Sequence, residues 1–525
     1  MFQSDLTQQP QLFAFSPRDL VPKGSDVWLY MDLFDSLNTE EFEWDYVASG
    51  QQAKDPKLML RTIFYGLTHG VNSGRALASA CTTDVRFIVL SGERMPDART
   101  FHRFIRRHEE RMPELFTQVV QLAMKMGLAK LGRIAIDGSR LKANTSKHKA
   151  MSYGRMKKTV DQLNEELQAM KRELESLSEE DQSASELPDE IKRREDRLAK
   201  IKSAKDALEK EKGEALKDSD QKSFNDHDAL PMAGKGEGFK YGYNAQAAVD
   251  EDNQIIVGCK LHDNQCDSGS VASTLEEVAK NCGDNPSEVL VDSAYSNAKD
   301  LGAIEAVGAR PYAATGKGES SEITVDDQLI AEEDSHEYSC MAGKLLPTRA
   351  RQSNGKTVIQ QLPKSFCRGC PFKAECKLTK KKSRYTIRPR NEWNTVQANR
   401  ERMRSGGNGV FKRRKAIVEP VFGNIKTKGI KINIEGNSKV STWWTMVCMA
   451  LNLEKIVGHL ASVEVLALNF LSKMTLSKIC LKNTMLKFIS DLRQIFDKVI
   501  LLRTRPYRSC QVACQGFYLR CAPAS

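Results

Sequence analysis

The sequence lacks any run of about 18 consecutive apolar residues, the length that a membrane-spanning helix needs, so nothing in it indicates a membrane protein. Its first 15 residues also lack the basic segment and following apolar stretch of a secretory signal peptide. The 13 cysteines are an odd number in a long chain without such a segment. They favour reduced thiols or metal ligands over a framework of disulfides.

The composition is that of a folded protein, with 40% hydrophobic and 28% charged residues in a chain of 525. That length leaves room for roughly two to four domains. The net charge is +11, and the excess is concentrated in residues 377–431, which hold 17 Lys and Arg but only 3 acidic residues. Such a block repels itself unless an anion neutralises it. Because Tyr385 and Trp393 are interleaved, we favour a nucleic acid partner over a solvated face.

The chain up to residue 128 is expected to be helical. Apolar residues recur at helical spacing in two stretches, 56–67 and 100–126, and Asp97 is a suitable N-cap for the second. This second helix also carries Arg103 and Arg107, one helical turn apart. The basic residues of this helix fit a solvated face and a contact with the DNA backbone equally well.

Short, β-branched runs take over after Leu131. The segment RIAIDGS is expected to be a buried strand that ends in a turn. Three similar strands follow at 243–250, 254–262 and 288–296, and the first two of these read as a pair joined by a tight acidic turn.

A helical hairpin is predicted between the first strand and the second. Apolar residues step by three and four from Val160 to Leu177, and heptad-compatible spacing resumes from Ile191 to Leu208 after a polar break. Only about three heptads per arm favour a self-packed antiparallel hairpin over a long intermolecular coiled coil.

Three carboxylates stand out as candidates for chemistry. Asp137 and Asp292 each follow an apolar strand and precede small residues, so both are expected to point into a cleft. Glu419 is the only acidic residue between Lys412 and Lys431, so we do not expect it to be an ordinary exposed surface residue. Pro420 suits either a first helical turn or a kink. Three carboxylates that share two divalent ions are the usual device for phosphodiester chemistry, whereas any one Asp alone fits a turn or a cap equally well.

Several blocks, taken in order, resemble the bacterial insertion-sequence transposases of the DDE type: DGSRLKANTSKHKAMSYGRM, YNAQAAVD, VDSAYSN and RKAIVEPVFGNIK. The stretch from LMLRTIFYGLTHG through DARTFHRFIRRH resembles their InsH-type N-terminal domain, and the likeness covers roughly residues 20–460. It implies an α/β fold of the RNase H-like class, a mixed five-stranded sheet flanked by helices. It also implies that Asp137, Asp292 and Glu419 form a triad that binds Mg²⁺ or Mn²⁺.

The same resemblance places a basic residue seven positions after the glutamate, where Lys426 stands. Many relatives also have a Tyr and an Arg upstream of the glutamate. Here that stretch reads Phe411-Lys412-Arg413-Arg414-Lys415, so the tyrosine hydroxyl is missing, which affects a phosphate contact rather than the metal site. The residues expected to bind DNA are Arg103, Arg107, Arg414, Lys415 and Lys426.

Four cysteines lie in the segment before the glutamate: Cys340, Cys367, Cys370 and Cys376. The central CxxC has the knuckle spacing of zinc sites, and similar transposases carry a cysteine cluster here, so a structural Zn²⁺ is expected. Free thiols in a poorly ordered insertion are the alternative. A redox role is disfavoured, because no thioredoxin-like strand and helix surround the pair.

The last 65 residues, 461–525, depart from the family pattern. We interpret them as a non-native or frame-shifted extension, with a genuine helical accessory element as the alternative. The expected domains are a helical DNA-binding domain at 1–128, a catalytic core at 129–154 with 223–325 and 405–460, an inserted hairpin at 155–222, a Cys-rich basic insertion at 326–404, and this tail.

These observations predict a DNA transposase that cuts transposon ends and joins the freed 3′-hydroxyl to target DNA. Double-stranded DNA is the expected partner, a homodimer the expected assembly and the nucleoid-associated cytoplasm the expected location, with no membrane association. Two alternatives stay open: a catalytically inactive or domesticated DNA-binding relative, and an RNase H-like nuclease without strand transfer.

Overall fold

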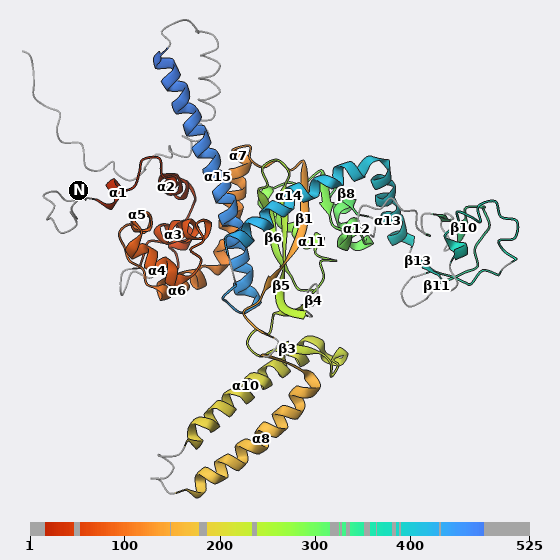
Figure 1. Ribbon diagram of the computed structural model, residues 1–525, viewed down its shortest axis with the longest axis horizontal. Coiled ribbons are helices and arrows are strands. Elements are labelled where there is room, and N and C mark those ends of the chain that lie inside the picture. The colour runs from red at the N-terminus through yellow and green to blue at the C-terminus, as the bar shows by residue number, and fades with distance from the viewer. Residues whose placement is uncertain are drawn as a thin grey trace, which may run out of the picture.

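A mixed β-sheet with helices on both faces forms the centre of the molecule in the computed structural model (Figure 1). The start of the chain before residue 16 and the tail after residue 476 lie outside the described residues, and with them Cys480, Cys510, Cys514 and Cys521. The structure describes residues 16–46, 53–146, 149–177, 186–233, 239–314, 325, 328–331, 337–350, 357–363, 365–380, 385–387, 390–429 and 432–476.

Five strands of the central sheet lie in the order β6-β5-β1-β7-β8, and a short strand, β4, pairs with the first residues of β5. β1 runs antiparallel to β5 and parallel to β7, so the sheet is mixed, as expected. The expected count of five strands is exceeded by β4. The strands are β1 (Arg133–Lys142), β4 (Leu230–Ala233), β5 (Phe239–Asp250), β6 (Ile256–His262), β7 (Glu288–Val291) and β8 (Arg310–Ala313).

The first strand is longer than the sequence suggested. We expected a turn after Asp137, yet β1 continues to Lys142, because β5 supplies antiparallel partners as far as Gly242. Its pairing with β7 does end there, since the last matched residues are Ile136 and Val291. Asp137 therefore lies inside one strand pair and at the end of another.

The two faces of the sheet are covered by different helices. On one face α11 packs against β6, where a Cβ on Gly258 would lie 2.8 Å from the Val278 side chain. On the other face α14 crosses β8, β7, β1 and β5, and α15 packs on β6 (Figure 1). The helices of this part are α11 (Val271–Cys282), α12 (Ala298–Ala306), α13 (Arg390–Arg402), α14 (Asn408–Thr427) and α15 (Asn437–Leu476).

The chain before the sheet is helical, as predicted, and Asp97 caps its helix by accepting from the Thr100 amide. The single helix expected over 100–126 is two helices, because Pro113 cannot continue a helix and instead occupies the first turn of the next. The helices are α1 (Pro17–Leu20), α2 (Asp26–Ser36), α3 (Pro56–Thr68), α4 (Gly74–Thr83), α5 (Val85–Leu90), α6 (Ala98–Arg107) and α7 (Met112–Lys125).

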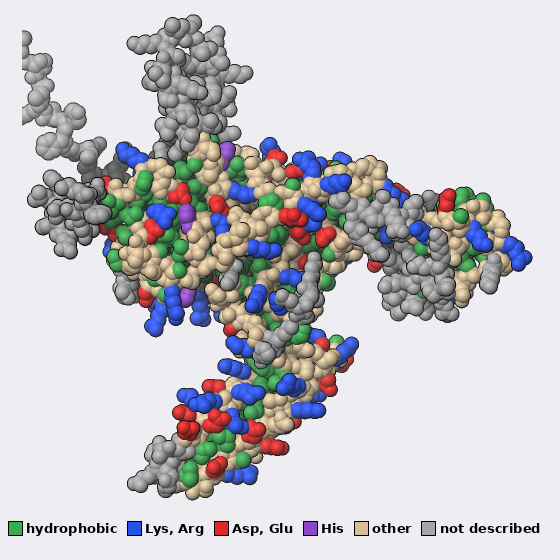
Figure 2. Space-filling view, viewed as in Figure 1, with side chains coloured by type: hydrophobic (Ala, Val, Ile, Leu, Met, Phe, Trp, Pro, Cys, Tyr) green, Lys and Arg blue, Asp and Glu red, His purple; other side chains and the backbone are tan. Residues whose placement is uncertain are grey.

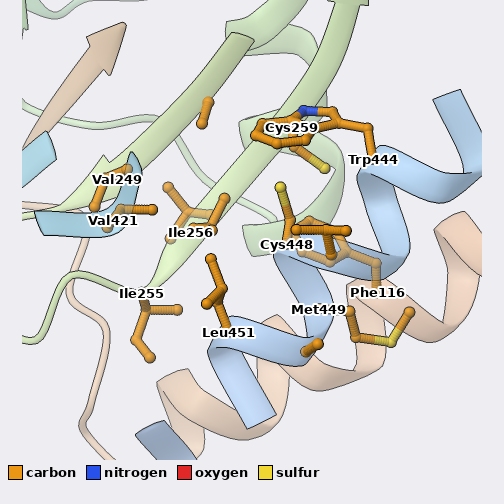
Figure 3. Packing of buried hydrophobic residues seen from close by; sticks show 14 of the residues in the cluster. Phe116, Val249, Ile255, Ile256, Cys259, Val421, Trp444, Cys448, Met449 and Leu451 are labelled. Carbon is orange, nitrogen blue, oxygen red and sulfur yellow. The ribbon is translucent and has the colours of Figure 1, made fainter. Parts of the chain in front are cut away.

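These N-terminal helices share one continuous apolar core with the sheet. Figure 3 shows Phe116 of α7 beside Cys448 and Met449 of α15, which in turn pack on β6. A buried hydrogen bond of 2.7 Å from Thr117 to Asn281 also joins α7 to α11. The shared core therefore couples the helical part to the sheet.

Two long helices, α8 (Tyr153–Ser176) and α10 (Leu187–Lys212), form an arm that projects from the sheet (Figure 1). Their buried residues include Leu163, Leu167, Ile191 and Leu198, at the positions that the heptad pattern selects. The short strands β2 (Ala150–Ser152) and β3 (Gln221–Ser223) pair at the base of the arm.

A small lobe precedes α13 and has its own buried cluster around Tyr338 and Ile359. It is built from two short sheets, β9 with β10 and β11-β12-β13. Its strands are β9 (Leu329–Ala331), β10 (Tyr338–Cys340), β11 (Thr348–Ala350), β12 (Thr357–Ile359) and β13 (Tyr385–Ile387).

Within the described residues, one helical segment, Asn437–Val463 of α15, is long and apolar enough to cross a membrane by length and composition alone. It packs in the core here, with Trp444 and Val447 fully buried. Asn452 of the same segment bonds both main-chain groups of Ile256 on β6, each at 2.8 Å. This segment is a core helix of the fold.

Candidate active site

The side chain of Asp137 projects from β1 toward α14, where it meets a buried arginine. Arg414 donates from Nη1 to Asp137 Oδ2 at 2.9 Å, and its side chain is 9% exposed. The other oxygen, Oδ1, accepts from the Gly138 amide at 3.0 Å. The guanidinium Nε of Arg414 is buried and has no hydrogen-bond partner within the described part of the chain. The structure therefore places a counter-ion with a spare donor directly on this carboxylate.

Asp292 lies at the next position in register on the neighbouring strand. The parallel pairs of β1 and β7 end with Ile136 and Val291, so Asp137 and Asp292 come directly after them on adjacent strands. Asp292 caps the short 3₁₀ turn Ser293–Tyr295, and its Oδ1 accepts from the Ser293 amide at 2.6 Å. The structure thus brings together two of the three expected carboxylates.

The electrostatics of the pair follow from this placement. Burial raises the pKa of the Asp137 carboxyl above its ordinary value, and the charge of Asp292 raises it further. Arg414 opposes both effects through its charge and its hydrogen bond, yet burial prevails. Burial therefore disfavours the charged form of Asp137, and a bound cation would stabilise that form.

Glu419 lies on α14, as expected, but its side chain is exposed, contrary to our expectation. The reason is helical geometry, because Ile417, Val418 and Val421 occupy the side of α14 that packs on the sheet. At 3.6 residues per turn, Glu419 falls roughly 140° around the helix from Arg414. Pro420 lies in the interior of α14 rather than in its first turn.

The exposed flank of α14 that carries Glu419 also carries basic residues. Lys415, Glu419 and Lys426 are all exposed, and helical geometry places them within about 40° of one another. Arg413 lies about 120–160° from these three residues on a different flank, where its Nε bonds Glu251 at 2.7 Å. Lys415 and Lys426 are therefore available to an external anion, whereas Arg414 is engaged inside the fold.

No group of three or more His, Cys, Asp or Glu side chains is placed to hold a metal ion anywhere in the described part of the chain. The expected three-carboxylate cluster is accordingly not assembled. Two carboxylates on adjacent strands still fit Mg²⁺, which is commonly bound by one or two carboxylates plus water and phosphate oxygens. Asp137 and Asp292 are the residues that fit this role.

The four cysteines expected to bind zinc belong to the small lobe. Burial raises the pKa of the Cys367 thiol, and the charges of Cys376, Cys370 and Cys340 raise it further. All four are free thiols of intermediate exposure. Four thiols are a donor set that suits zinc, although their placement here does not form a closed metal site.

The basic residues of α6 lie on the surface of the helical part. Arg103 and Arg107 are both exposed, and Figure 2 shows Lys and Arg side chains projecting where Figure 1 places α6. The Arg107 guanidinium lies over the Tyr46 ring, 4.7 Å from its centroid. Arg103 is thus the freer of the two for an external phosphate or base.

Sequence reasoning missed three residues beside the aspartates. It grouped Arg414 with the DNA contacts, because a buried arginine looks like its exposed neighbours in the run KRRK. It also passed over Gln246 and Tyr295, both fully buried. A glutamine among the apolar residues of YNAQAAVD was the available clue, since a buried amide needs a partner.

Two family profiles match the chain. One, described as a transposase DDE domain, matches residues 339–457, which include Glu419 and the four cysteines. The other, described as the transposase domain DUF772, matches residues 15–107, which include α6. No curated protein and no solved structure matches the chain significantly. Both profiles are those of transposases, and together they support the resemblance of the chain to insertion-sequence transposases of the DDE type.

Proposed function

We propose that this protein cuts DNA at the terminal inverted repeats of a transposon and joins the freed 3′-hydroxyl to target DNA. The observation that carries the proposal is the pairing of Asp137 with Asp292 at matching positions of adjacent strands. The exposed basic flank of α14, with Lys415 and Lys426, runs over the same face of the sheet and suits a phosphate backbone. The family profiles, both of transposases, support this class of reaction.

In this proposal Asp137 and Asp292 hold a Mg²⁺ or Mn²⁺ ion, with Glu419 as a further carboxylate of the site. The bound ion would supply Lewis-acid stabilisation and an activated oxygen nucleophile. Arg414 donates to Asp137 Oδ2 and offsets the charge of this carboxylate.

DNA would contact two surfaces. Arg103 and Arg107 on α6 would recognise the transposon end, and Lys415 and Lys426 would hold phosphates near the site. Both contacts predict an affinity that falls steeply with salt. A homodimer in the nucleoid-associated cytoplasm is the proposed assembly and location, since two ends must be joined.

We also propose that Cys340, Cys367, Cys370 and Cys376 bind one structural Zn²⁺. Zinc would stabilise a lobe whose own buried cluster is small. Metal analysis of the purified chain should find one zinc per chain, and Cys367→Ser should remove it. Equal zinc content in the two proteins would contradict this assignment.

The test of the catalytic proposal is a cleavage and joining assay on DNA that carries the inverted repeats flanking the gene. Wild type should cut in Mg²⁺ or Mn²⁺ and join the cut end to a target plasmid. Asp137→Ala should bind the same DNA but cut at least 100-fold more slowly. Cleavage by Asp137→Ala at the wild-type rate would contradict the proposal.

A second candidate function rests on two observations, the exposure of Glu419 and the hydrogen bond of Arg414 to Asp137. These features fit a catalytically inactive or domesticated relative that binds DNA without cutting it. Binding without cleavage by wild type would favour this candidate. Cleavage without joining would instead favour an RNase H-like nuclease.

A further inference from the structure

A polar cluster of two buried residues and one half-buried residue lies on the face of the sheet opposite α14, beneath the two aspartates. It consists of Gln246 on β5, Tyr295 in the turn after β7, and Asp267 in the loop between β6 and α11. The Tyr295 hydroxyl donates to Gln246 Oε1 at 2.7 Å, and Gln246 Nε2 donates to Asp267 Oδ1 at 3.0 Å. None of the roles described above uses these three side chains.

The absence of a side chain at Gly138 makes room for this cluster. Gly138 is the partner of Gln246 in the register of β1 and β5. A Cβ on Gly138 would lie 2.4 Å from Gln246 Nε2 and 2.5 Å from Asp267 Oδ1, closer than real contacts allow. Because successive side chains of a strand point to opposite faces, Asp137 faces α14 while Gly138 faces the cluster.

Tyr295 spans the strand that carries Asp137. β5 and β7 flank β1 on its two sides, and strands lie about 4.8 Å apart. The Tyr295 side chain therefore crosses beneath β1 to reach Gln246. Its own turn is the one that Asp292 caps, and the Tyr295 amide donates to the Asp292 carbonyl at 3.1 Å.

Further hydrogen bonds join the Asp267 loop to the chain just after this turn. Asn297 donates to Ser268 Oγ at 3.0 Å, and the Gly269 amide donates to Asp300 Oδ2 at 2.8 Å. Burial, with the charges of Asp267 and Asp137, holds the pKa of Tyr295 well above its usual range. The hydroxyl thus stays a proton donor to Gln246.

We propose that Gln246, Tyr295 and Asp267 are positioning residues that fix the Asp292 turn against β1. By doing so they set the separation of the Asp137 and Asp292 carboxylates for a shared divalent ion. The cluster rests on the proposed function, since it matters only if these two aspartates bind a metal. Residues that orient metal ligands in this way typically change metal affinity by 10- to 100-fold when mutated.

The test compares two tyrosines of the full-length protein, with Mn²⁺ alone as the probe and free Mn²⁺ followed by electron paramagnetic resonance. Tyr295→Phe removes only the hydroxyl that bonds Gln246. Tyr30→Phe is the matched control, because the Tyr30 hydroxyl is equally buried and donates to Thr68 Oγ1 at 3.0 Å, in the N-terminal helices. Tyr295→Phe should weaken Mn²⁺ binding by about 10-fold or more, and Tyr30→Phe should leave it within about twofold of wild type.

All proteins are titrated below their melting transitions, so that lost stability alone does not alter the affinity. If Tyr295→Phe does not fold, Gly138→Ala serves instead, because its Cβ displaces Gln246 and Asp267. Wild-type affinity in a folded Tyr295→Phe or Gly138→Ala overturns the positioning role and leaves the proposed function standing. A wild-type protein that binds no Mn²⁺ contradicts the proposed function, and the positioning role fails with it.

Discussion

Two charged clusters lie along α14, one at each of two consecutive arginines, and they differ in how completely their charges are paired. Arg413 is 60% exposed and bonds Glu251, which Arg133 also contacts at 3.0 Å. Arg414 is 9% exposed and pairs with Asp137, and its Nε has no hydrogen-bond partner among the described residues. In the Arg413 cluster each charged group has a partner of opposite charge. In the Arg414 cluster one buried donor, Nε, lacks a hydrogen-bond partner within the part of the chain that the structure describes.

This difference separates a structural role from the functional role that we propose. The Arg413 cluster ties α14 to the turn between β5 and β6, because Glu251 follows β5 directly. At the Arg414 cluster, this unpartnered buried donor and a carboxyl with a raised pKa lie together. Such groups concentrate where a ligand completes the site. Changes at the two arginines should therefore have different consequences.

The largest expected effect is on stability. Arg414→Gln leaves the Asp137 carboxylate buried without a counter-charge, which should lower the free energy of unfolding by about 2–4 kcal/mol. Arg413→Gln removes an arginine that is 60% exposed and leaves Glu251 paired with Arg133, so it should cost less than about 1 kcal/mol. Urea unfolding measures both values. The double variant Arg414→Gln/Asp137→Asn should recover much of the lost stability. Equal losses of stability in Arg414→Gln and Arg413→Gln would contradict the difference between the two clusters.

A smaller effect should appear in the pH dependence of stability. Because the folded-state pKa of Asp137 lies above its usual value of 3.8, the folded protein keeps a proton that the unfolded chain has released just above that pH. The contribution of Asp137 to stability therefore falls as the pH rises through this window. Asp137→Asn should remove that part of the pH dependence, as unfolding curves between about pH 4 and pH 7 would show. If the pH dependence of stability is the same in Asp137→Asn as in wild type, the raised pKa of Asp137 is not its cause.

The smallest effect concerns DNA binding by the two flanks of α14. Lys415→Gln and Lys426→Gln should each reduce the slope of log affinity against log salt by about 1, since each removes one phosphate contact. Arg413→Gln should leave the slope unchanged, because Arg413 is bonded to Glu251 on a different flank. Fluorescence anisotropy at several salt concentrations measures the slopes. If Arg413→Gln reduces the slope as much as the lysine substitutions do, the proposed DNA contact with the Lys415 and Lys426 flank is contradicted.

Periodicity in the sequence predicted much of the fold. The spacing of Leu163, Leu167 and Leu198 predicted the buried seam of the helical arm, and the apolar run of RIAI predicted a buried strand. These features depend on local pattern, which a sequence displays directly. The helix break at Pro113 was also readable, although we passed over it, because proline stops a helix by its own chemistry.

What the sequence could not show was pairing between distant residues. Nothing local distinguishes Arg414, which meets Asp137, from Arg413, which meets Glu251. The continuation of β1 past Asp137 depends on β5, more than 100 residues later in the chain. The exposure of Glu419 similarly depends on which side of α14 packs on the sheet.

The most direct test of the metal site is a Mn²⁺ titration of the full-length wild type, Asp137→Asn and Asp292→Asn in the absence of DNA. Each substitution removes one carboxylate charge and keeps nearly the same shape. We predict that each weakens Mn²⁺ binding by at least about 10-fold and that the double variant binds none. Wild-type Mn²⁺ affinity in both single variants would contradict a shared site at these two strands.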